Sequence, residues 1–577
     1  MNQSKRQLTI NGSNKKVRIS KHGTHIEDLS NELIIEVFDY LDGCDLYKAF
    51  SKLNKRFQDI LSCPYIRPKI NIVNSSKRDI LFDYTKIILP NKHQIVSICI
   101  LNPLAIDLFS QTMKFDLSFH RLESVVLYGL KASDLVALLL TLISIPQLSL
   151  LIITLTDINI KDFSNAYRLI FSLPALKYNK LHFIGPTPSL YLTNINIRPS
   201  TITHLNIDHA CYLNDVVHML SYTPYLRRIV FGKLMQSYRN IEKITLSLPY
   251  LTHISIGKCY LQFDELDIFI KKISSQLQML RISTCDDETY LDPDRWERLI
   301  SKYIPYLRNF YFEYHQLVND NFQTTSYNEL IHRFTSEFWR ERRWIFKLEM
   351  NVNFFFLTNV VYSIHPYREN WDEIHKEHWN SNIALDVFNG TELSIFESSF
   401  TDYNDSLIDN LAPLFDIVQI TKLDFTFEAT FVGMLLDLLR YLPNLNSLRV
   451  RSLSLTKPRC LHAEEERISR LISIDNKIRK VHIQQMTDLE QIQFLINICP
   501  LMQYLDIGFS DNMDLKLLLK FILMKNREQI SHLRVLCLCT PRINQKMFED
   551  LQNLVRMKKQ YQKYTIKHIN NRIYIQR

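Results

Sequence analysis

A group of three histidines and three acidic residues contains the side chains best suited to chemistry: His365, Asp372, Glu373, His375, Glu377 and His378. Metal-binding histidine pairs on one helix are usually four residues apart, as in H-E-x-x-H. His375 and His378 are three residues apart, and the chain contains no H-E-x-x-H motif. We therefore interpret these histidines as surface residues of a charged loop and predict no metal site.

Motifs of enzymes that bind nucleotides or use a nucleophile are absent from the sequence. It contains no GxGxxG, no GxxxxGK, no GxSxG and no CxxC, and its ten glycines are few for a chain with phosphate-binding loops. The ten cysteines are scattered, mostly within apolar runs, which is typical of buried reduced thiols in an intracellular protein. We expect no cofactor and no catalytic residue, so any chemistry would belong to a partner.

Basic residues concentrate at the two ends of the chain. Residues 1–25 contain six basic and no acidic residues, and residues 551–577 contain seven basic and no acidic residues. Since the formal net charge is +9, these thirteen charges leave −4 for the residues between them. No nucleic-acid partner is expected, because the body has no basic groove to follow phosphates. Residues 1–25 are predicted to be a disordered tail.

The uncharged residues 135–155 form a stretch long enough to cross a bilayer. Pro146 lies in its middle, and Ser and Thr recur within it. We therefore predict a helix, a turn led by proline and a strand, and no membrane contact. The N-terminal residues lack the apolar core of a secretory signal, and we expect a location in the cytoplasm, the nucleus or both.

Apolar residues recur in the pattern L-x-x-L-x-L through most of the chain. Successive repeats begin 24 to 30 residues apart within residues 91–315, and the pattern returns within residues 420–577. A proline often stands one or two residues before the first apolar position, as in Pro224-Tyr225-Leu226 and Pro249-Tyr250-Leu251. The predicted repeats are Ile95-Ile98-Ile100, Leu122-Val125-Leu127, Leu148-Leu151-Ile153, Tyr178-Leu181-Phe183, Ile202-Leu205-Ile207, Leu226-Ile229-Phe231, Leu251-Ile254-Ile256, Leu277-Leu280-Ile282, Leu307-Phe310-Phe312, Ile420-Leu423-Phe425, Leu445-Leu448-Val450, Ile478-Val481-Ile483, Met502-Leu505-Ile507 and Leu533-Leu536-Leu538.

Each repeat is predicted to be a helix, a proline stop and a short strand whose alternate residues point inward. One such unit cannot bury its own apolar face, so units must stack. Cys259 and Cys285 lie where a leucine-rich repeat carries Asn or Cys. The array therefore resembles leucine-rich repeats, which implies an α/β repeat fold, a solenoid or horseshoe whose surface holds a substrate protein. A globular α/β domain with coincidental spacing is the alternative.

Residues 316–419 are less regular and contain four of the five tryptophans: Trp339, Trp344, Trp371 and Trp379. One further strand is predicted around Ile345-Leu348-Met350, and residues 367–371 and 375–379 are predicted to form an extended loop or insertion. The aromatic and Arg residues fit either a protein-binding surface or filler between divergent repeats. A hidden hydrolase or transferase in this region is a further alternative.

The C-terminal residues alternate between apolar and polar side chains on either side of Asn570-Asn571. Asn tolerates the backbone conformations that tight turns require. We therefore predict a hairpin over residues 564–575 that caps the array after the Leu533 repeat. A frayed basic tail is the alternative.

Residues 26–62 form the most specific pattern in the chain. Apolar residues follow the helix N-cap residue Ser30 at helical spacing, and Gly43 interrupts them before a second apolar set. Three short helices are predicted. A segment of this size cannot bury all its apolar residues alone, so part of this apolar surface is expected to face another protein.

The order Leu29-Ser30-x-Glu32-Leu33, Val37-Phe38-x-Tyr40-Leu41, Asp45-Leu46 and Lys55-x-Phe57 resembles the F-box. That family implies binding to Skp1 and, through it, to cullin-RING ligase subunits. Ser30 stands where the family usually has proline; it keeps the helix cap but removes the rigid Leu-Pro entry to the partner. A generic three-helix start to a larger helical domain is the alternative. The residues expected to form the Skp1-binding box are Leu29, Ser30, Leu33, Val37, Phe38, Leu41, Leu46, Phe50 and Phe57.

Both resemblances together imply a substrate-recognition adaptor of a Skp1–cullin–F-box (SCF) ubiquitin ligase, which holds its target near the transferring enzyme and is not itself an enzyme. A scaffold whose F-box binds Skp1 alone is the alternative. The expected segments are a disordered basic tail (1–25), the F-box (26–62), a connector (63–90), the first part of the array (91–315), irregular repeats or an insertion (316–419), and the second part with its hairpin cap (420–577).

Overall fold

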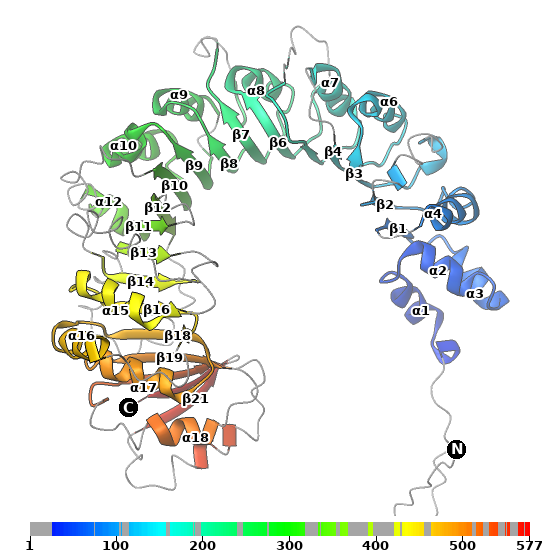
Figure 1. Ribbon diagram of the computed structural model, residues 1–577. Coiled ribbons are helices and arrows are strands. Elements are labelled where there is room, and N and C mark those ends of the chain that lie inside the picture. Colours follow the sequence, from blue (N-terminus) through cyan, green and yellow to red (C-terminus); the bar gives the residue numbers. More distant parts are fainter. Residues whose placement is uncertain are drawn as a thin grey trace, which may run out of the picture. The chain divides into compact units, whose positions relative to one another are not determined.

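The fold is known from a computed structural model (Figure 1), in which the chain divides into two compact units. Unit 1 comprises Met1–Asp157 and Asn165–Asn179, and unit 2 comprises Ile158–Ser164 and Lys180–Arg577. The predicted tail, residues 1–25, lies outside the residues that the structure describes. These are residues 26–73, 76–102, 105–106, 115–156, 162–188, 190, 198–238, 246–273, 276–317, 333–334, 336–352, 358–366, 391–395, 420–426, 430–454, 463–509, 515–522, 530–539, 548–549, 551–553, 564–569 and 572–576.

Unit 1 begins with three short α-helices and continues as strands that alternate with helices. The strands β1 to β4 pair in parallel, each with the next one along the chain. The segment 63–90, expected as a connector, contains a strand and a helix of its own. The elements are η1 (Ile26–Asp28), α1 (Asn31–Phe38), α2 (Gly43–Phe50), α3 (Lys55–Leu61), β1 (Lys69–Ile72), α4 (Lys77–Asp83), η2 (Tyr84–Ile88), β2 (Ser97–Ile100), η3 (Leu117–Phe119), β3 (Ser124–Leu130), α6 (Ala132–Leu142), β4 (Leu150–Leu155), α7 (Ser164–Ser172) and β5 (Tyr178–His182), which contains the boundary between the units.

The apolar positions of the repeats form the core of unit 1. The strand register aligns four buried side chains, one from each strand: Ile70, Ile98, Val125 and Leu151. The uncharged residues 135–155 form the end of α6, a short turn and β4, as predicted. No helix within the described ranges is long and apolar enough to cross a membrane.

Unit 2 continues the alternation of strands and helices. Strands β6 to β10 pair in parallel in chain order, and Figure 1 shows α8, α9 and α10 along one side of them. The elements are β6 (His204–Tyr212), α8 (Leu213–Leu220), β7 (Arg228–Met235), β8 (His253–Cys259), α9 (Phe263–Ile273), β9 (Met279–Cys285), η4 (Glu288–Leu291), α10 (Pro293–Tyr303), β10 (Asn309–Leu317), α12 (Glu337–Glu341), β11 (Trp344–Val352), β12 (Thr358–Pro366), β13 (Thr391–Ile395), β14 (Lys422–Phe425), β15 (Thr430–Phe431), α15 (Val432–Tyr441), β16 (Ser447–Val450), β17 (Leu453–Ser454), α16 (Ala463–Asp475), β18 (Lys480–Met486), α17 (Leu489–Ile498), β19 (Tyr504–Phe509), α18 (Leu515–Lys520), β20 (Val535–Cys539), β21 (Thr565–Ile569) and β22 (Arg572–Gln576).

The middle apolar positions of the predicted repeats lie opposite one another in unit 2. In β6 to β10 the aligned residues are Leu205, Ile229, Ile254, Leu280 and Phe310, all buried. In β14, β16, β18, β19 and β20 they are Leu423, Leu448, Val481, Leu505 and Leu536, also buried. The alternate strand residues are partly exposed in β6 to β9. The chain is therefore an α/β protein with repeated strand–helix units, and the predicted register is confirmed at these positions.

One predicted repeat has the wrong register. The sequence pattern gave Tyr178-Leu181-Phe183, but Tyr178 is half-buried whereas Leu176 and Asn179 are buried. The backbone N–H groups of Lys177 and Tyr178 donate to Ser149 O in the way that those of Ser149 and Leu150 donate to Glu123 O. Leu176, Asn179 and Leu181 thus hold the inward positions. The pattern failed because one inward residue is polar: Asn179, whose side chain donates to Leu151 O at 3.3 Å.

Residues 316–419 interrupt the parallel order. Strand β12 lies antiparallel between β10 and β11, and β11 then pairs in parallel with β13. The strand predicted around Ile345-Leu348-Met350 is β11. Trp339 and Trp344 are buried, their ring centroids 5.9 Å apart, so these two residues fill the core. His365 lies on β12 opposite Ile345, so its predicted place in a loop is wrong. Residues 367–371 and 375–379, which include His375 and His378, lie outside the described residues.

The predicted C-terminal hairpin is present. Strands β21 and β22 are antiparallel, and Ile569 lies opposite Arg572. Strand β22 also pairs antiparallel with β20, the strand of the Leu533 repeat. The hairpin therefore covers the edge of β20, an edge that would otherwise expose unpaired backbone groups.

A buried carboxylate fastens this hairpin to the strands before it. Asp506 on β19 is fully buried, and its Oδ2 lies 2.9 Å from His482 Nδ1 and 3.3 Å from Arg572 Nη1 on β22. Burial raises the pKa of Asp506, but the hydrogen bond from His482 and the charges of His482 and Arg572 outweigh it, so the pKa lies below its usual value.

The inward register predicts opposite outcomes for two neighbouring residues of β8. Ile254→Asp places a charge in the core between Ile229 and Leu280, at a cost of several kcal/mol, and should lower the melting temperature of the full chain sharply. Ser255→Asp, on the partly exposed side of the same strand, should melt close to the wild type. Equal melting temperatures of the two variants would contradict the register.

The Asp506 cluster predicts a pH-dependent stability. Arg572→Met leaves the carboxylate with one partner fewer and should cost about 3 kcal/mol of unfolding free energy, whereas Arg572→Lys should cost less. Since the pKa of Asp506 is lowered on folding, its stabilisation is present above the usual value of about 3.9 and is lost as the pH falls through the lower folded value. Below a pH of roughly 5, the free energy of unfolding measured with urea should therefore change less with pH in Asp506→Asn than in the wild type. An identical pH dependence in the two proteins would refute this role of Asp506.

Candidate functional site

Each of the three N-terminal helices begins at a side chain that caps it. Ser30 Oγ accepts a hydrogen bond from Leu33 N–H at 3.4 Å, Asp42 Oδ1 accepts one from Cys44 N–H at 2.8 Å, and Asn54 Oδ1 accepts one from Phe57 N–H at 3.1 Å. Each bond satisfies a backbone donor that the helix leaves unpaired. The cap predicted at Ser30 is confirmed.

The helices share a core of three phenylalanines, one from each helix. The ring centroid of Phe50 lies 4.7 Å from that of Phe38 and 5.2 Å from that of Phe57. Phe38 and Phe57 are buried, and so are Ile34 and Leu46. These side chains hold α1, α2 and α3 together.

Arg56 on α3 holds the residues that lead into α1. Its Nη1 donates to Glu27 O at 2.5 Å, its Nη2 donates to Leu29 O at 2.6 Å, and its Nε donates to Asn31 Oδ1 at 2.9 Å. A guanidinium forms several such bonds in a fixed geometry. The entry to α1 is thereby fixed although proline is absent from it.

Helix α2 attaches the three helices to the first strand of unit 1. Asp42 Oδ2 accepts a hydrogen bond from Asn71 N–H at 2.7 Å, and a Cβ at Gly43 would lie 2.8 Å from Ile70 Cδ1. Further along α2, Tyr47 Oη donates to Gln94 Oε1 at 2.8 Å and Lys48 Nζ lies 2.7 Å from Asp83 Oδ1. One side of the segment is therefore occupied by unit 1 itself.

The structure sorts the predicted box residues into three groups. Phe38, Leu46 and Phe57 are buried, Leu29 and Phe50 are half-buried, and Ser30, Leu33, Val37 and Leu41 are exposed. The buried residues form the core of the segment, so they are not available to a partner. The exposed residues are available to a partner.

Four exposed apolar residues form a stripe along α1 and the turn after it, called the α1 stripe here: Leu33, Val37, Tyr40 and Leu41. Leu33 is 48% exposed and Tyr40 is 85% exposed. Leu33 and Val37 are four residues apart and therefore lie on one side of α1, and Tyr40 and Leu41 follow in the turn after it. Tyr40 belongs to the motif but not to the residues expected to bind Skp1. The core residue Ile34 is not predicted from the sequence, because spacing does not tell which of two adjacent apolar residues faces inward.

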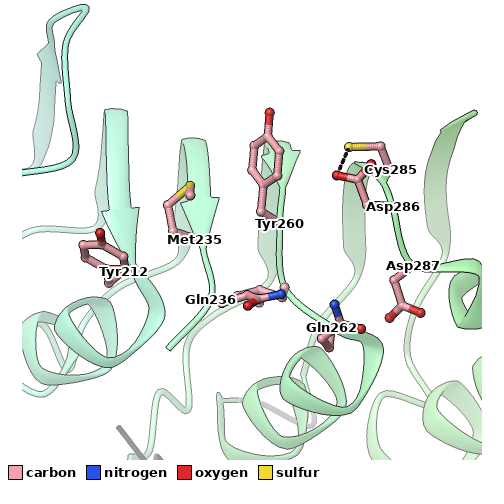
Figure 2. A pocket seen from close by; sticks show the side chains of 9 residues that line it. Tyr212, Met235, Gln236, Tyr260, Gln262, Cys285, Asp286 and Asp287 are labelled. Carbon is pink, nitrogen blue, oxygen red and sulfur yellow. Dashed lines mark hydrogen bonds between the residues drawn. The ribbon is translucent and has the colours of Figure 1, made fainter. Parts of the chain in front are cut away.

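A second candidate is a hollow of about 340 Å³ in unit 2, at the carboxyl ends of β6, β7, β8 and β9 (Figure 2). Its wall includes Tyr212 and Tyr260, and Cys285 Sγ donates to Asp286 Oδ2 at 3.2 Å. Asp286 has φ of 70°, which is uncommon for a residue other than glycine. The hollow thus combines aromatic rings with acidic side chains.

The hollow contains no activated nucleophile among the groups that form its wall. Burial and the hydrogen bond to Asp286 raise the pKa of Cys285 to about 11, so the thiol stays protonated at neutral pH. The carboxylate of Asp287 accepts hydrogen bonds from Phe263 N–H and Thr289 N–H. These groups can bind another molecule, but they do not form an acid–base pair.

Comparison with known proteins does not decide between the α1 stripe and the hollow in unit 2, so both are judged on their geometry. The chain matches no protein-family model and no curated protein. Over the part of the chain that the structure describes, no three His, Cys, Asp or Glu side chains come together to hold a metal ion.

The role of Arg56 predicts that its loss loosens the start of α1. Arg56→Ala removes three hydrogen bonds, two of them to backbone oxygens, and should cost on the order of 2 kcal/mol. Hydrogen exchange of residues 27–38 should become faster than in Lys55→Ala, a control at the exposed preceding position of α3. Equal exchange in the two variants would show that Arg56 does not hold this segment.

Proposed function

We propose that the chain is a substrate-recognition adaptor of an SCF ubiquitin ligase. In this proposal residues 26–62 are an F-box that binds Skp1, and Skp1 connects the chain to cullin-RING subunits. The repeated strand–helix units are leucine-rich repeats stacked as a solenoid, and they bind the substrate protein. The chain supplies no catalytic residue; it raises the local concentration of the target lysine near the enzyme that carries ubiquitin.

The observation that carries the proposal is the division of the motif residues between a core and the α1 stripe. Phe38, Phe50 and Phe57 pack against one another inside the segment. Leu33, Val37 and Leu41, from the same motif, remain in solvent. Covering the exposed half of each such side chain would contribute about 1 kcal/mol to the free energy of binding. Burial of the α1 stripe would therefore stabilise a complex with a protein partner.

The attachment of the segment to unit 1 supports an adaptor over a mobile anchor. Gly43, Tyr47 and Lys48 on α2 lie against Ile70 of β1, Gln94 of the turn before β2 and Asp83 of α4, respectively. A partner bound to the α1 stripe is therefore held in a fixed position relative to the strands of unit 1. Rigid attachment of this kind favours transfer between two bound molecules, because less orientational freedom has to be lost.

A scaffold that binds Skp1 alone fits the same stripe. The two functions differ in what accompanies Skp1: an SCF adaptor purified with Skp1 from cells should bring down cullin and RING subunits in comparable amounts. Skp1 recovered repeatedly without them would favour the scaffold.

The direct test is binding of purified Skp1 to the full chain. The double variant Leu33→Asp, Val37→Asp places two charges on the α1 stripe and should weaken binding by about hundredfold or more. Phe38→Asp is unsuitable because Phe38 is in the core. The matched control is Leu140→Asp on α6, where Leu140 is 57% exposed; it should bind as the wild type does. All variants should retain the wild-type melting temperature.

Two outcomes would overturn the proposal. One is that Skp1 does not bind the wild-type chain. The other is that the double variant binds Skp1 as well as Leu140→Asp does.

A further inference from the structure

A row of basic side chains lies at the starts of three unit 2 strands, on the side that helices do not cover. The first residues of β6, β7 and β8 are His204, Arg228 and His253, and the register places them next to one another. Arg227 immediately precedes Arg228, and both arginines are exposed. Two guanidinium groups and two imidazoles are thus gathered where three parallel strands start.

No acid among the described residues forms an ion pair with the two arginines of this row. The acid of the same side, Asp208 on β6, is engaged by Lys180 at 2.9 Å and His182 at 3.0 Å. Burial, together with the charge of Arg228, lowers the pKa of both His204 and His253, which agrees with a positive potential at the row.

Two exposed tyrosines stand in the turns that precede β7 and β8. Tyr225 and Tyr250 come from the repeated Pro-Tyr-Leu segments, three residues before Arg228 and His253. Their rings are stacked, with centroids 6.3 Å apart and planes at 26°, and about half of each residue is exposed, 51% and 53% respectively. We call the six residues together the Tyr–Arg row: His204, Tyr225, Arg227, Arg228, Tyr250 and His253.

The neighbouring backbone aligns these residues. The N–H groups of Arg227 and Arg228 donate to Thr203 O, and those of Thr252 and His253 donate to Arg227 O. The residues before the strands therefore keep the spacing of the sheet. A partner meets a fixed surface with an apolar aromatic part and a cationic part, the residue types that dominate binding at protein interfaces.

We propose that the Tyr–Arg row binds an acidic segment of a partner protein, rich in Asp and Glu and containing apolar side chains. The arginines pair with carboxylates, which match the planar guanidinium, and the tyrosine pair packs against the apolar side chains. If the chain is an adaptor as proposed above, this segment belongs to its substrate. The binding itself does not depend on Skp1.

A nucleic acid fits the row less well. The row offers only two permanent positive charges, whereas binding to nucleic acid depends on many phosphate contacts. Single-stranded binders also stack bases on free aromatic faces, but Tyr225 and Tyr250 already stack on each other. A phosphopeptide is disfavoured as well, because no helix N-terminus or buried donor among the described residues is recorded in contact with the arginines.

The test uses the full chain and a fluorescein-labelled peptide of alternating Glu and Val, followed by fluorescence anisotropy. The peptide should bind the wild type, with an affinity that falls as salt is added. Arg227→Glu, Arg228→Glu should weaken binding by about tenfold or more, and Tyr250→Ala should weaken it at high salt as well. Arg440→Glu, an exposed position on α15, is the matched charge control and should bind as the wild type does.

Three probes decide between the classes of partner. Binding of the Glu–Val peptide, but not of its Gln–Val analogue, supports the proposal. It is overturned if the Glu–Val peptide does not bind, if Arg440→Glu weakens it equally, or if a phosphoserine peptide or a single-stranded RNA binds the row and the Glu–Val peptide does not. Skp1 affinity, measured on the same variants, should stay at the wild-type value; its absence in the wild type would refute the adaptor function and not this site.

Discussion

Alignment of inward-facing apolar side chains across neighbouring strands is the constraint on which the rest of the structure depends. A strand such as β8 buries Ile254 and Ile256 only because strands lie on both sides of it and helices cover one face. Each strand–helix repeat is therefore stable only when its neighbouring repeats are folded beside it. The spacing is close enough that a Cβ at Gly508 on β19 would lie 2.0 Å from Gln484 O, so this position requires glycine.

The same constraint explains which elements pack against the first and the last strand of the parallel array. At the N-terminal side, β1 provides a strand against which α2 packs at Gly43, so the three N-terminal helices are attached there. At the C-terminal side, the hairpin of β21 and β22 pairs with β20 and adds the Arg572–Asp506 ion pair. The exposed α1 stripe is what remains after α1 has used Ile34 and Phe38 for its own core.

The sequence was sufficient to predict most strands of the repeats, because their inward positions are apolar, but not all of them. Strand β1 was not predicted although Ile70 and Ile72 are buried, since it stands before the regular spacing begins. Asn179 displaced one predicted repeat by two residues, because a buried amide looks like a surface residue in a hydrophobic pattern. Strand β12 was missed because antiparallel pairing between β10 and β11 leaves no trace in the repeat spacing. The C-terminal hairpin was predictable because alternation and turn residues are local signals.

The candidate site was predictable as a set of residues but not as a surface. Helical spacing identified Leu33, Val37, Phe38 and Leu41 together, yet only packing against Phe50 and Phe57 decides that Phe38 is the inward one. The Tyr–Arg row has a related explanation. Pro-Tyr-Leu was seen as a helix stop, whereas the stacking of Tyr225 on Tyr250 depends on strands paired in register.

We propose that the α1 stripe, and not the sheet, is the surface that Skp1 covers. Hydrogen–deuterium exchange of the full chain with and without saturating Skp1 tests this proposal. Exchange within residues 31–41 should be slower in the complex, and exchange in β6 to β10 should be unchanged. Unchanged exchange within residues 31–41, or protection confined to the strands of unit 2, would contradict it.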